Sequence, residues 1–251
     1  TLLLISNEAR LTVFKGDITN PEKISFIALL TSRSSSCTGA LIGKNIVSTA
    51  AHCACSKSPT SKASFLAAGT YKKAGFKTTA IHFEVHPSYY DECLKMINGT
   101  GSKNPVQGGD MALMKLMKSP LRIPKIRMVN IDFDYRAKFG DQVMSMGYGK
   151  DESISNSFSN SGILKSGKLR VSVCPEKMSD DPICFISSEV NVQVTGSGDS
   201  GGPLYHPTRD IVLGNVSGKI SYKRSSLVLT IFTRFSAQKE FIKGFIERNE
   251  M

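Results

Sequence analysis

The sequence lacks three features that would point to familiar classes of protein: a long apolar run, a paired Cys-x-x-Cys motif, and basic residues interleaved with aromatic ones. A membrane-spanning helix needs roughly 18 consecutive apolar residues, so we expect a soluble chain with no membrane partner. Common zinc sites use closely spaced cysteine pairs, and nucleic-acid-binding modules use basic and aromatic motifs. We therefore predict no metal ion, no other cofactor and no nucleic-acid partner.

Acidic residues are also scarce, since 21 Asp and Glu against 32 Lys and Arg give a formal net charge of +11. The basic residues are spread along the chain instead of forming one block. A solvated basic surface explains this pattern most simply, and the alternative is a surface that binds an anionic glycan. The scattered residues include Lys72, Lys73, Lys115, Lys118, Lys165, Lys168, Lys223 and Arg224.

Short apolar runs separated by polar turns predict an all-β fold. The chain contains 21 glycines and 10 prolines, which suits many short strands joined by turns. The last segment differs, because Phe241, Ile242, Phe245 and Ile246 recur at helical spacing among charged residues. We predict that one amphipathic helix closes the chain, with Ser236 as its N-cap.

Pro120 and Pro124 interrupt regular structure and indicate a crossover between two halves. We set the boundary near residue 123, which gives an N-terminal half at 11–123 and a C-terminal half at 124–251. The apolar stretch TLLLIS is too short for a complete signal peptide. Residues 1–10 are therefore interpreted as the remnant of a leader or a propeptide.

Six cysteines, an even number, predict disulfides and hence an oxidising compartment. The sequon Asn98-Gly99-Thr100 is compatible with a glycosylated protein. Together these features predict a secreted, extracellular location.

The segment GSGDSGGPLY places Ser200 in a glycine-rich turn that suits a nucleophile. A serine hydroxyl needs a base to remove its proton and donors to stabilise the oxyanion that it creates. The turn can supply the donors, because the backbone amides of Gly198 and Ser200 can converge on one point. His52 in STAAHC and Asp110 in GGDMALMKL are candidates for the base and its partner, although each alone is more typical of a structural residue.

Taken together, TAAHC, GDMALMKL and GDSGGPL in the order His, Asp, Ser resemble the trypsin/chymotrypsin-like serine endopeptidases over nearly the whole chain. The resemblance implies two antiparallel six-stranded β-barrels with a C-terminal helix. It implies that His52 is the general base and then the general acid, that Asp110 orients it, and that Ser200 forms the acyl-enzyme. Gly198 and Ser200 would form the oxyanion hole.

The same resemblance implies how the cysteines pair and which histidines are structural. The expected disulfides join Cys37 to Cys53 and Cys174 to Cys184, which leaves Cys55 for Cys93. His86 lies in VHPSYY, a structural segment of the family, and the two remaining histidines, His82 and His206, lie in no motif.

The family's activation step implies roles for Asp199 and for a cleavage site near the N-terminus. In the family this aspartate pairs with an α-amino group that proteolysis sets free. We predict cleavage after Arg10, with Leu11 as the new terminus. The stretch Val13-Phe14-Lys15-Gly16 also fits the family's terminal motif, so two termini stay open.

The residues that correspond to the family's specificity pocket depart from the trypsin-like pattern. Val194 stands where trypsin-like members have an aspartate, so no preference for Lys or Arg before the scissile bond is expected. Lys219 and Thr230 replace glycines, and Gly196 replaces a cysteine. We predict a narrow pocket for small or medium uncharged residues, with acidic residues second. The other residues assigned to substrate binding are Thr195, Ser217 and Gly218.

Lys219 leaves three alternatives open, because its side chain can plug the pocket, present its ammonium group to an acidic residue, or extend into solvent. Asn215, in a second sequon, is interpreted as structural because the resemblance buries it beside the active site. The loop GTYKKAGFK lacks acidic ligands, so no calcium ion is expected.

Two functions follow from these observations. The first is a secreted serine endopeptidase made as an inactive precursor, monomeric, with protein or peptide substrates and protease inhibitors as partners. The second is a catalytically silent homologue that uses the scaffold for binding, which the departures at Gly218 and Lys219 keep open. The intact set of His52, Asp110 and Ser200 favours the enzyme.

Overall fold

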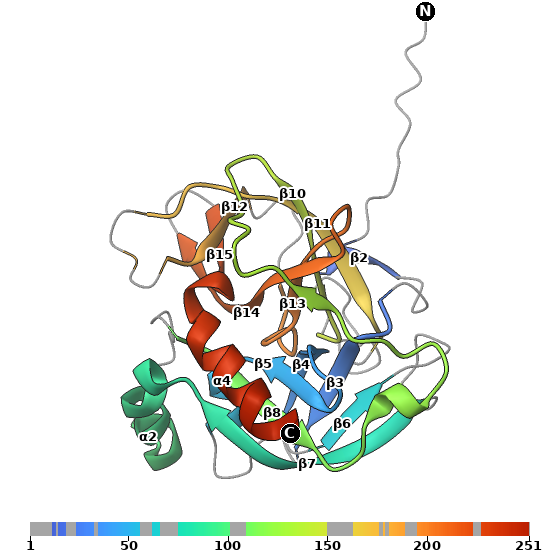
Figure 1. The fold of residues 1–251 in the computed structure, drawn as a ribbon. Coiled ribbons are helices and arrows are strands. Elements are labelled where there is room, and N and C mark those ends of the chain that lie inside the picture. The colour runs from blue at the N-terminus through green and yellow to red at the C-terminus, as the bar shows by residue number, and fades with distance from the viewer. Residues whose placement is uncertain are drawn as a thin grey trace, which may run out of the picture.

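The computed structural model describes the strands, helices and connecting segments of both halves of the chain (Figure 1). All structural statements refer to this part of the chain. It comprises residues 12–13, 15–18, 24–32, 35–55, 62–65, 75–100, 109–149, 163–175, 178, 181–188, 195–222 and 227–250.

Six strands of the N-terminal half form a closed antiparallel barrel in the order β3-β4-β5-β8-β7-β6. Closure leaves no unpaired strand edge in this half. The register pairs Thr49 at the end of β5 with Ala112 at the start of β8. Residues that follow β5 and residues that precede β8 therefore lie at the same end of the barrel. The strands are β3 (Ile27–Thr31), β4 (Ser36–Leu41), β5 (Ile46–Thr49), β6 (Lys62–Phe65), β7 (Phe76–Val85) and β8 (Ala112–Leu116).

The second sheet has nine strands, in the order β1-β2-β11-β10-β13-β14-β15-β12, with β9 pairing in parallel with the start of β14. Two of its strands, β1 and β9, have only two residues each, and β2 and β13 have four each. The sheet curls into a half-barrel, so the prediction of an all-β, two-barrel fold is confirmed. The strands are β1 (Thr12–Val13), β2 (Lys15–Ile18), β9 (Asn130–Ile131), β10 (Gln142–Gly147), β11 (Lys165–Arg170), β12 (Ile183–Ser188), β13 (Pro203–His206), β14 (Ile211–Tyr222) and β15 (Leu227–Arg234).

The closing helix is present as α4 (Lys239–Glu250), but its predicted N-cap is wrong. Ser236 is the first residue of a 3₁₀ turn, Ser236–Gln238, that leads into the helix. The hydroxyl of Ser236 is buried and has no hydrogen-bond partner among the described residues, so it caps nothing. The 3₁₀ turn replaces the cap by starting the helical path three residues earlier.

Two further α-helices among the described residues were not predicted. The short α1 (Ala51–Ala54) follows β5 directly, and α2 (Tyr90–Asn98) lies beside it in the lower left of Figure 1. Helix α2 ends at Gly99, whose φ of 76° gives the left-handed cap that glycine favours. A disulfide between Cys55 and Cys93 connects the two helical segments.

The N-terminal strands pack on the second half of the molecule, and the C-terminal helix packs on the first half. Strand β2 pairs with β11 of the second sheet and β1 pairs with β2, whereas α4 crosses the first barrel and contacts β8 (Figure 1). Ile242 and Phe245 of α4 are fully buried in the same apolar cluster as Leu113 and Met146, which come from the two different halves. One continuous core therefore holds the halves together, and the candidate site lies where they meet.

Candidate active site

His52 lies in helix α1, immediately after strand β5. Its backbone amide donates to Asp110 Oδ1 at 3.0 Å, and its ring Nδ1 lies 2.9 Å from Asp110 Oδ2. The pairing of β5 with β8 brings these two residues together although 58 positions separate them. The side chain of His52 is 17% exposed, so one edge of the ring stays open to solvent.

Asp110 is completely buried directly before β8, and donors surround it. In addition to His52, the hydroxyl of Ser217 donates to Oδ2 at 2.7 Å. The backbone carbonyl of Asp110 accepts hydrogen bonds from the Asn215 side chain at 3.2 Å and the Thr233 hydroxyl at 3.1 Å. A buried carboxylate is stable only when hydrogen bonds and charges replace water, and this network supplies the hydrogen bonds.

Two opposing effects set the basicity of His52. Burial of the imidazole works to lower its pKa, whereas the charge of Asp110 and the hydrogen bond to it work to raise it. The carboxylate prevails, and the pKa of His52 lies above its ordinary value. A histidine held in this way is a stronger base than a free imidazole.

Ser200 lies in the turn before β13 of the second half, and this turn is hydrogen-bonded to both halves. Its carbonyl accepts a hydrogen bond of 2.8 Å from the Thr38 amide of the first barrel, and the next amide, of Gly201, donates to Val216 of β14 at 2.8 Å. The sulfur of Cys53, adjacent to His52, lies 3.8 Å from the same carbonyl oxygen. No hydrogen bond joins the His52 ring to the Ser200 hydroxyl within the described residues, which is common before substrate binds.

The turn before Ser200 presents two backbone donors. Neither the Gly198 amide nor the Ser200 amide donates to an acceptor in the part of the chain that the structure describes. Gly198 has a φ of 102° and its carbonyl accepts from the Thr38 hydroxyl at 2.9 Å, which fixes the peptide plane. Residues other than glycine rarely adopt such a φ. The glycine at 198 therefore allows the backbone conformation that places the two amides.

Asp199 points away from this turn into the interior, where it is completely buried. Its two carboxylate oxygens accept hydrogen bonds from the Gly149 amide at 2.8 Å and the Gly196 amide at 2.7 Å. Burial raises the pKa of Asp199 to about 6, although both amides and the charges of Lys165 and Lys219 oppose that rise. The carboxylate therefore anchors the back of the turn that carries Ser200.

The family model for trypsin matches residues 13–242, which is most of the chain and includes every element of this site. The chain belongs to the trypsin family. It is also similar to a cercarial protease of Schistosoma mansoni, with 28% identity over 232 residues that cover 91% of this chain and 88% of that relative. Membership of the trypsin family makes the protein a serine endopeptidase, a hydrolase that acts on proteins or peptides.

The two disulfides expected from the trypsin-family resemblance are present, and so is the third, which was expected by elimination. They join Cys37 to Cys53, Cys55 to Cys93 and Cys174 to Cys184. Cys37, His52 and Cys53 cluster closely enough to suggest a metal site, but the disulfide removes both thiolates as ligands. None of the helices described in the structure is long and apolar enough to cross a membrane.

The residues assigned to the specificity pocket occupy different environments. Thr195 and Thr230 are buried, and Thr230 lies opposite Lys219 in the pairing of β14 with β15. Lys219 is exposed, and a side chain at Gly218 would meet open space. Ser217 is engaged with Asp110, so its hydroxyl supports the site instead of facing substrate. Val194, Arg10 and Leu11 lie outside the described residues.

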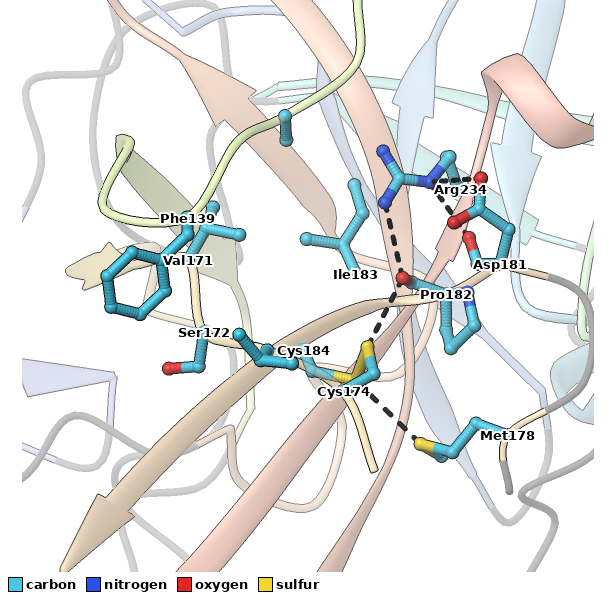
Figure 2. Close-up of a pocket in the computed structure, with 12 residues that line it drawn as sticks. Phe139, Val171, Ser172, Cys174, Met178, Asp181, Pro182, Ile183, Cys184 and Arg234 are labelled. Atoms are coloured by element: carbon cyan, nitrogen blue, oxygen red, sulfur yellow. Dashed lines mark hydrogen bonds and ion pairs between the residues drawn. A yellow bond between two sulfur atoms is a disulfide. The ribbon is translucent and has the colours of Figure 1, made fainter. Parts of the chain in front are cut away.

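A cavity of about 280 Å³ lies on the second half, and none of these residues lines it (Figure 2). Phe139, Val171 and the Cys174–Cys184 disulfide line it, with Arg234 at one end. The guanidinium of Arg234 donates to the carbonyls of Asp181 and Pro182 and pairs with the Asp181 carboxylate at 3.2 Å. Since Arg234 is thereby bound to the cavity wall, we interpret it as a structural brace for this segment.

Asn215, which the sequence analysis interprets as structural and buried beside the active site, is buried and holds the Asp110 backbone. Sequence reasoning missed two other residues of the site. Thr233 also holds the Asp110 backbone, and Lys165 is buried and its charge acts on Asp199. No local sequence signal points to Thr233 or Lys165, because their roles depend on strand pairing.

Proposed function

We propose that the protein is a secreted serine endopeptidase, made as a precursor, that hydrolyses peptide bonds through an acyl-enzyme on Ser200. The observation that carries this proposal is the buried Asp110 carboxylate bonded to Nδ1 of His52, beside a turn whose amides at 198 and 200 are available. With Nδ1 engaged, Nε2 of His52 is the nitrogen that can accept a proton from the Ser200 hydroxyl.

The proposed reaction has two steps. Ser200 Oγ attacks the scissile carbonyl carbon, His52 takes the hydroxyl proton, and the carbonyl oxygen becomes an oxyanion opposite the Gly198 and Ser200 amides. His52 then gives the proton to the leaving amine, so the C–N bond breaks and the acyl-enzyme forms. Water attacks the ester in the same way, and His52 returns the proton to Ser200.

The alternative, a catalytically silent homologue, is less well supported. A binding scaffold has no need of a buried carboxylate that receives donors from His52 and Ser217. The departures at Gly218 and Lys219 affect the neighbouring substrate wall and leave this network intact.

A fluorophosphonate probe, which phosphonylates activated serines, separates the two functions. The processed enzyme should be labelled, and the Ser200→Ala protein should not. Ser221→Ala, a change at an exposed serine of β14, is the matched control and should label like the native protein. A processed native protein that resists the probe would favour the silent homologue.

We infer a preference for small or medium uncharged residues before the scissile bond, with acidic residues second. The basis is Val194 in place of an aspartate, together with Thr230 and Lys219 in place of glycines. The exposed Lys219 suits an acidic side chain better than a basic one. A peptide library that shows dominant cleavage after Arg or Lys would rule this preference out.

We also propose activation by proteolysis, with Asp199 receiving the new α-amino group. Cleavage after Arg10 would expose Leu11, whereas the match to the trypsin family begins at Val13 and supports the second terminus. Mass spectrometry of the active enzyme decides between them, since its first residue will be Leu11, Val13 or neither.

Secretion, glycosylation and the remaining partners belong to the same proposal. Three disulfides suit an extracellular protein, and Asn98 is exposed at the end of α2, as a glycosylated asparagine must be. We expect the protein to be a monomer that protease inhibitors block. We also expect two halves, at 11–123 and 124–251, preceded by the remnant of a leader or propeptide at 1–10. Retention on heparin at physiological salt would support an anionic glycan partner, and early elution would exclude it.

A further inference from the structure

Arg234, at one end of the cavity in Figure 2, is almost completely buried, yet one of its guanidinium nitrogens has no acceptor. Nε donates to the carbonyl of Asp181 at 2.8 Å, and Nη2 donates to that of Pro182 at 3.3 Å. Nη1 makes no hydrogen bond to the described residues, and Figure 2 shows it turned away from Asp181 and Pro182. Two nitrogens therefore brace the wall, and the third is left for an acceptor that enters the cavity.

The charges at this end of the cavity do not balance. Among the described residues, Asp181 supplies the one carboxylate that lines the cavity, and it pairs with two cations, Arg234 at 3.2 Å and Arg136. Burial and the charge of Arg136 lower the pKa of Arg234, and they outweigh the opposing effect of Asp181. Two guanidinium groups and one carboxylate leave a positive charge in excess, so the site favours an anionic ligand.

The cavity also has an exposed apolar rim. Phe139 is 77% exposed and Val173 is 70% exposed, and they are the two most exposed large apolar residues of the described chain. Both line this cavity, together with Val171 and Ile183. Single exposed apolar residues are ordinary, but a group of them around a hollow is typical of an interaction site. A ligand with an apolar group next to its anion would cover this rim and remove it from water.

The size and surroundings of the cavity suit a polypeptide segment better than a small molecule. Pockets for small molecules usually measure about 300–1,000 Å³, and this one holds only about 280 Å³. Lys138 and Arg170 are exposed and directly precede the lining residues Phe139 and Val171. These cations, and the formal charge of +11, would attract an acidic segment. Proteins and peptides are the substrates of this enzyme, so a substrate can supply such a segment.

We propose that this cavity is a docking site for a segment of a protein substrate that carries an acidic residue beside an apolar one. The Asp or Glu side chain of the segment binds Nη1 of Arg234, and the apolar side chain packs on Phe139 and Val173. None of the catalytic residues lines the cavity, so a docked substrate leaves the catalytic site accessible to the bond that is cleaved. The inference deepens the proposed function, because it gives substrates of the same enzyme a second contact.

The first test measures binding to Ser200→Ala protein, which cannot cleave its ligand. The probe is a fluorescein-labelled peptide, Gly-Leu-Glu-Glu-Leu-Gly, with both ends capped. Its fluorescence anisotropy should rise to saturation, and the affinity should fall as salt is added. Peptides with Lys in place of Glu, or with Ser in place of Leu, should bind about tenfold more weakly or worse. Absence of saturable binding, or equal binding of the lysine peptide, would overturn the proposal.

Variants locate the bound peptide. Arg234→Met removes the proposed donor but also removes the brace of the wall, so Val173→Asp is the decisive variant. It adds a negative charge to the exposed rim and should weaken binding of the Glu peptide by about tenfold. Met117→Asp is the matched control, since Met117 is 60% exposed just after β8 of the first barrel, and it should bind like the parent. Equal binding to Val173→Asp and to the parent would contradict the proposed site.

The second test measures cleavage by the processed enzyme. Two substrates share one short cleaved sequence, and a flexible linker joins the Glu peptide to only one of them. The attached peptide should lower KM by about tenfold with little change in kcat, because remote binding raises the local concentration of the cleaved sequence. Val173→Asp should abolish this difference between the substrates, and Met117→Asp should preserve it. Equal KM values with the native enzyme would overturn this inference alone, whereas failure to cleave either substrate would count against the proposed function.

Discussion

Ser217 donates a hydrogen bond of 2.7 Å to Oδ2 of Asp110, the same oxygen that faces the His52 ring. The strand β14 is irregular at this point, with its register shifting between Val216 and Gly218. A bulge of this kind re-aims a side chain, and here it turns Ser217 toward the other half of the molecule. The orientation of the histidine therefore depends on contacts from both sheets.

Removing the Ser217 hydroxyl should weaken this support. We expect Ser217→Ala to lower the free energy of unfolding by about 1–3 kcal/mol, the usual cost of a lost buried hydrogen bond to a charged group. The kcat should fall while KM changes little, because the imidazole loses part of its positioning. Urea unfolding and peptide hydrolysis measure the two effects. Ser221→Ala, at an exposed serine, is the control and should change neither the free energy of unfolding nor kcat. An unchanged kcat in Ser217→Ala would show that this hydrogen bond does not contribute to catalysis.

Replacing the carboxylate itself should be far more severe. Asp110→Asn keeps the size of the side chain but presents the wrong hydrogen-bonding group to Nδ1, so we expect kcat to fall by about 10⁴. Asp134→Asn is the matched control, since the Asp134 side chain is 91% exposed. Retention of more than a tenth of the native kcat in Asp110→Asn would contradict the assigned role.

The protonation of His52 should follow its raised pKa. In Ser200→Ala protein, which cannot digest itself, NMR should show the His52 ring titrating with a midpoint above about 6.5, the ordinary value. Asp110→Asn in the same background should move the midpoint down, because burial then acts without the opposing carboxylate. A midpoint below the ordinary value with Asp110 present would mean that burial prevails.

Asp199 should make the stability of the uncleaved chain depend on pH. Its folded pKa of about 6 exceeds the ordinary value, so the folded state binds a proton that the unfolded state releases. Stability from this group should decline as the pH rises from about 4 to about 6, by on the order of 3 kcal/mol. Asp199→Asn should flatten the profile over that interval in urea unfolding. A profile as steep as that of the parent would show that the carboxyl titrates normally.

The disulfide between Cys55 and Cys93 should matter more for stability than the one between Cys174 and Cys184. The two bridges close separations of 38 and 10 residues, and chain entropy assigns them about 4 and about 3 kcal/mol. Pairwise replacement by alanine, followed by urea unfolding, measures the difference. Loss of the first bridge should also loosen α2 beside His52, and the reverse order of the two costs would contradict this account.

The all-β class could be predicted because short apolar runs separated by turns are a local signal. Two cysteine pairs followed from the family resemblance, and the pair of Cys55 with Cys93 followed by elimination. Helix α2 was missed, although Asp91 and Glu92 in its first turn, Lys95 in its last and Gly99 at its end are typical helix signals. These signals lie between two recognised motifs, VHPSYY and GGDMALMKL, and the sequence analysis predicts no helix there.

Other features could not be predicted from local pattern. That β2 would pair with β11 follows from a contact between distant segments, which periodicity does not report. Lys165 is buried where β11 pairs with both β10 and β2, so its burial depends on the same long-range pairing. The link from Ser217 to Asp110 depends likewise on a bulge that the resemblance did not specify.

Trapping the acyl-enzyme tests the central claim most directly. The processed enzyme, mixed with an ester that has a good leaving group at mildly acidic pH, should gain the mass of one acyl group. Digestion should locate that group on the peptide that contains Ser200, and Ser200→Ala should gain none. An acyl group found on another residue, or retained in Ser200→Ala, would contradict the claim that this hydroxyl is the nucleophile.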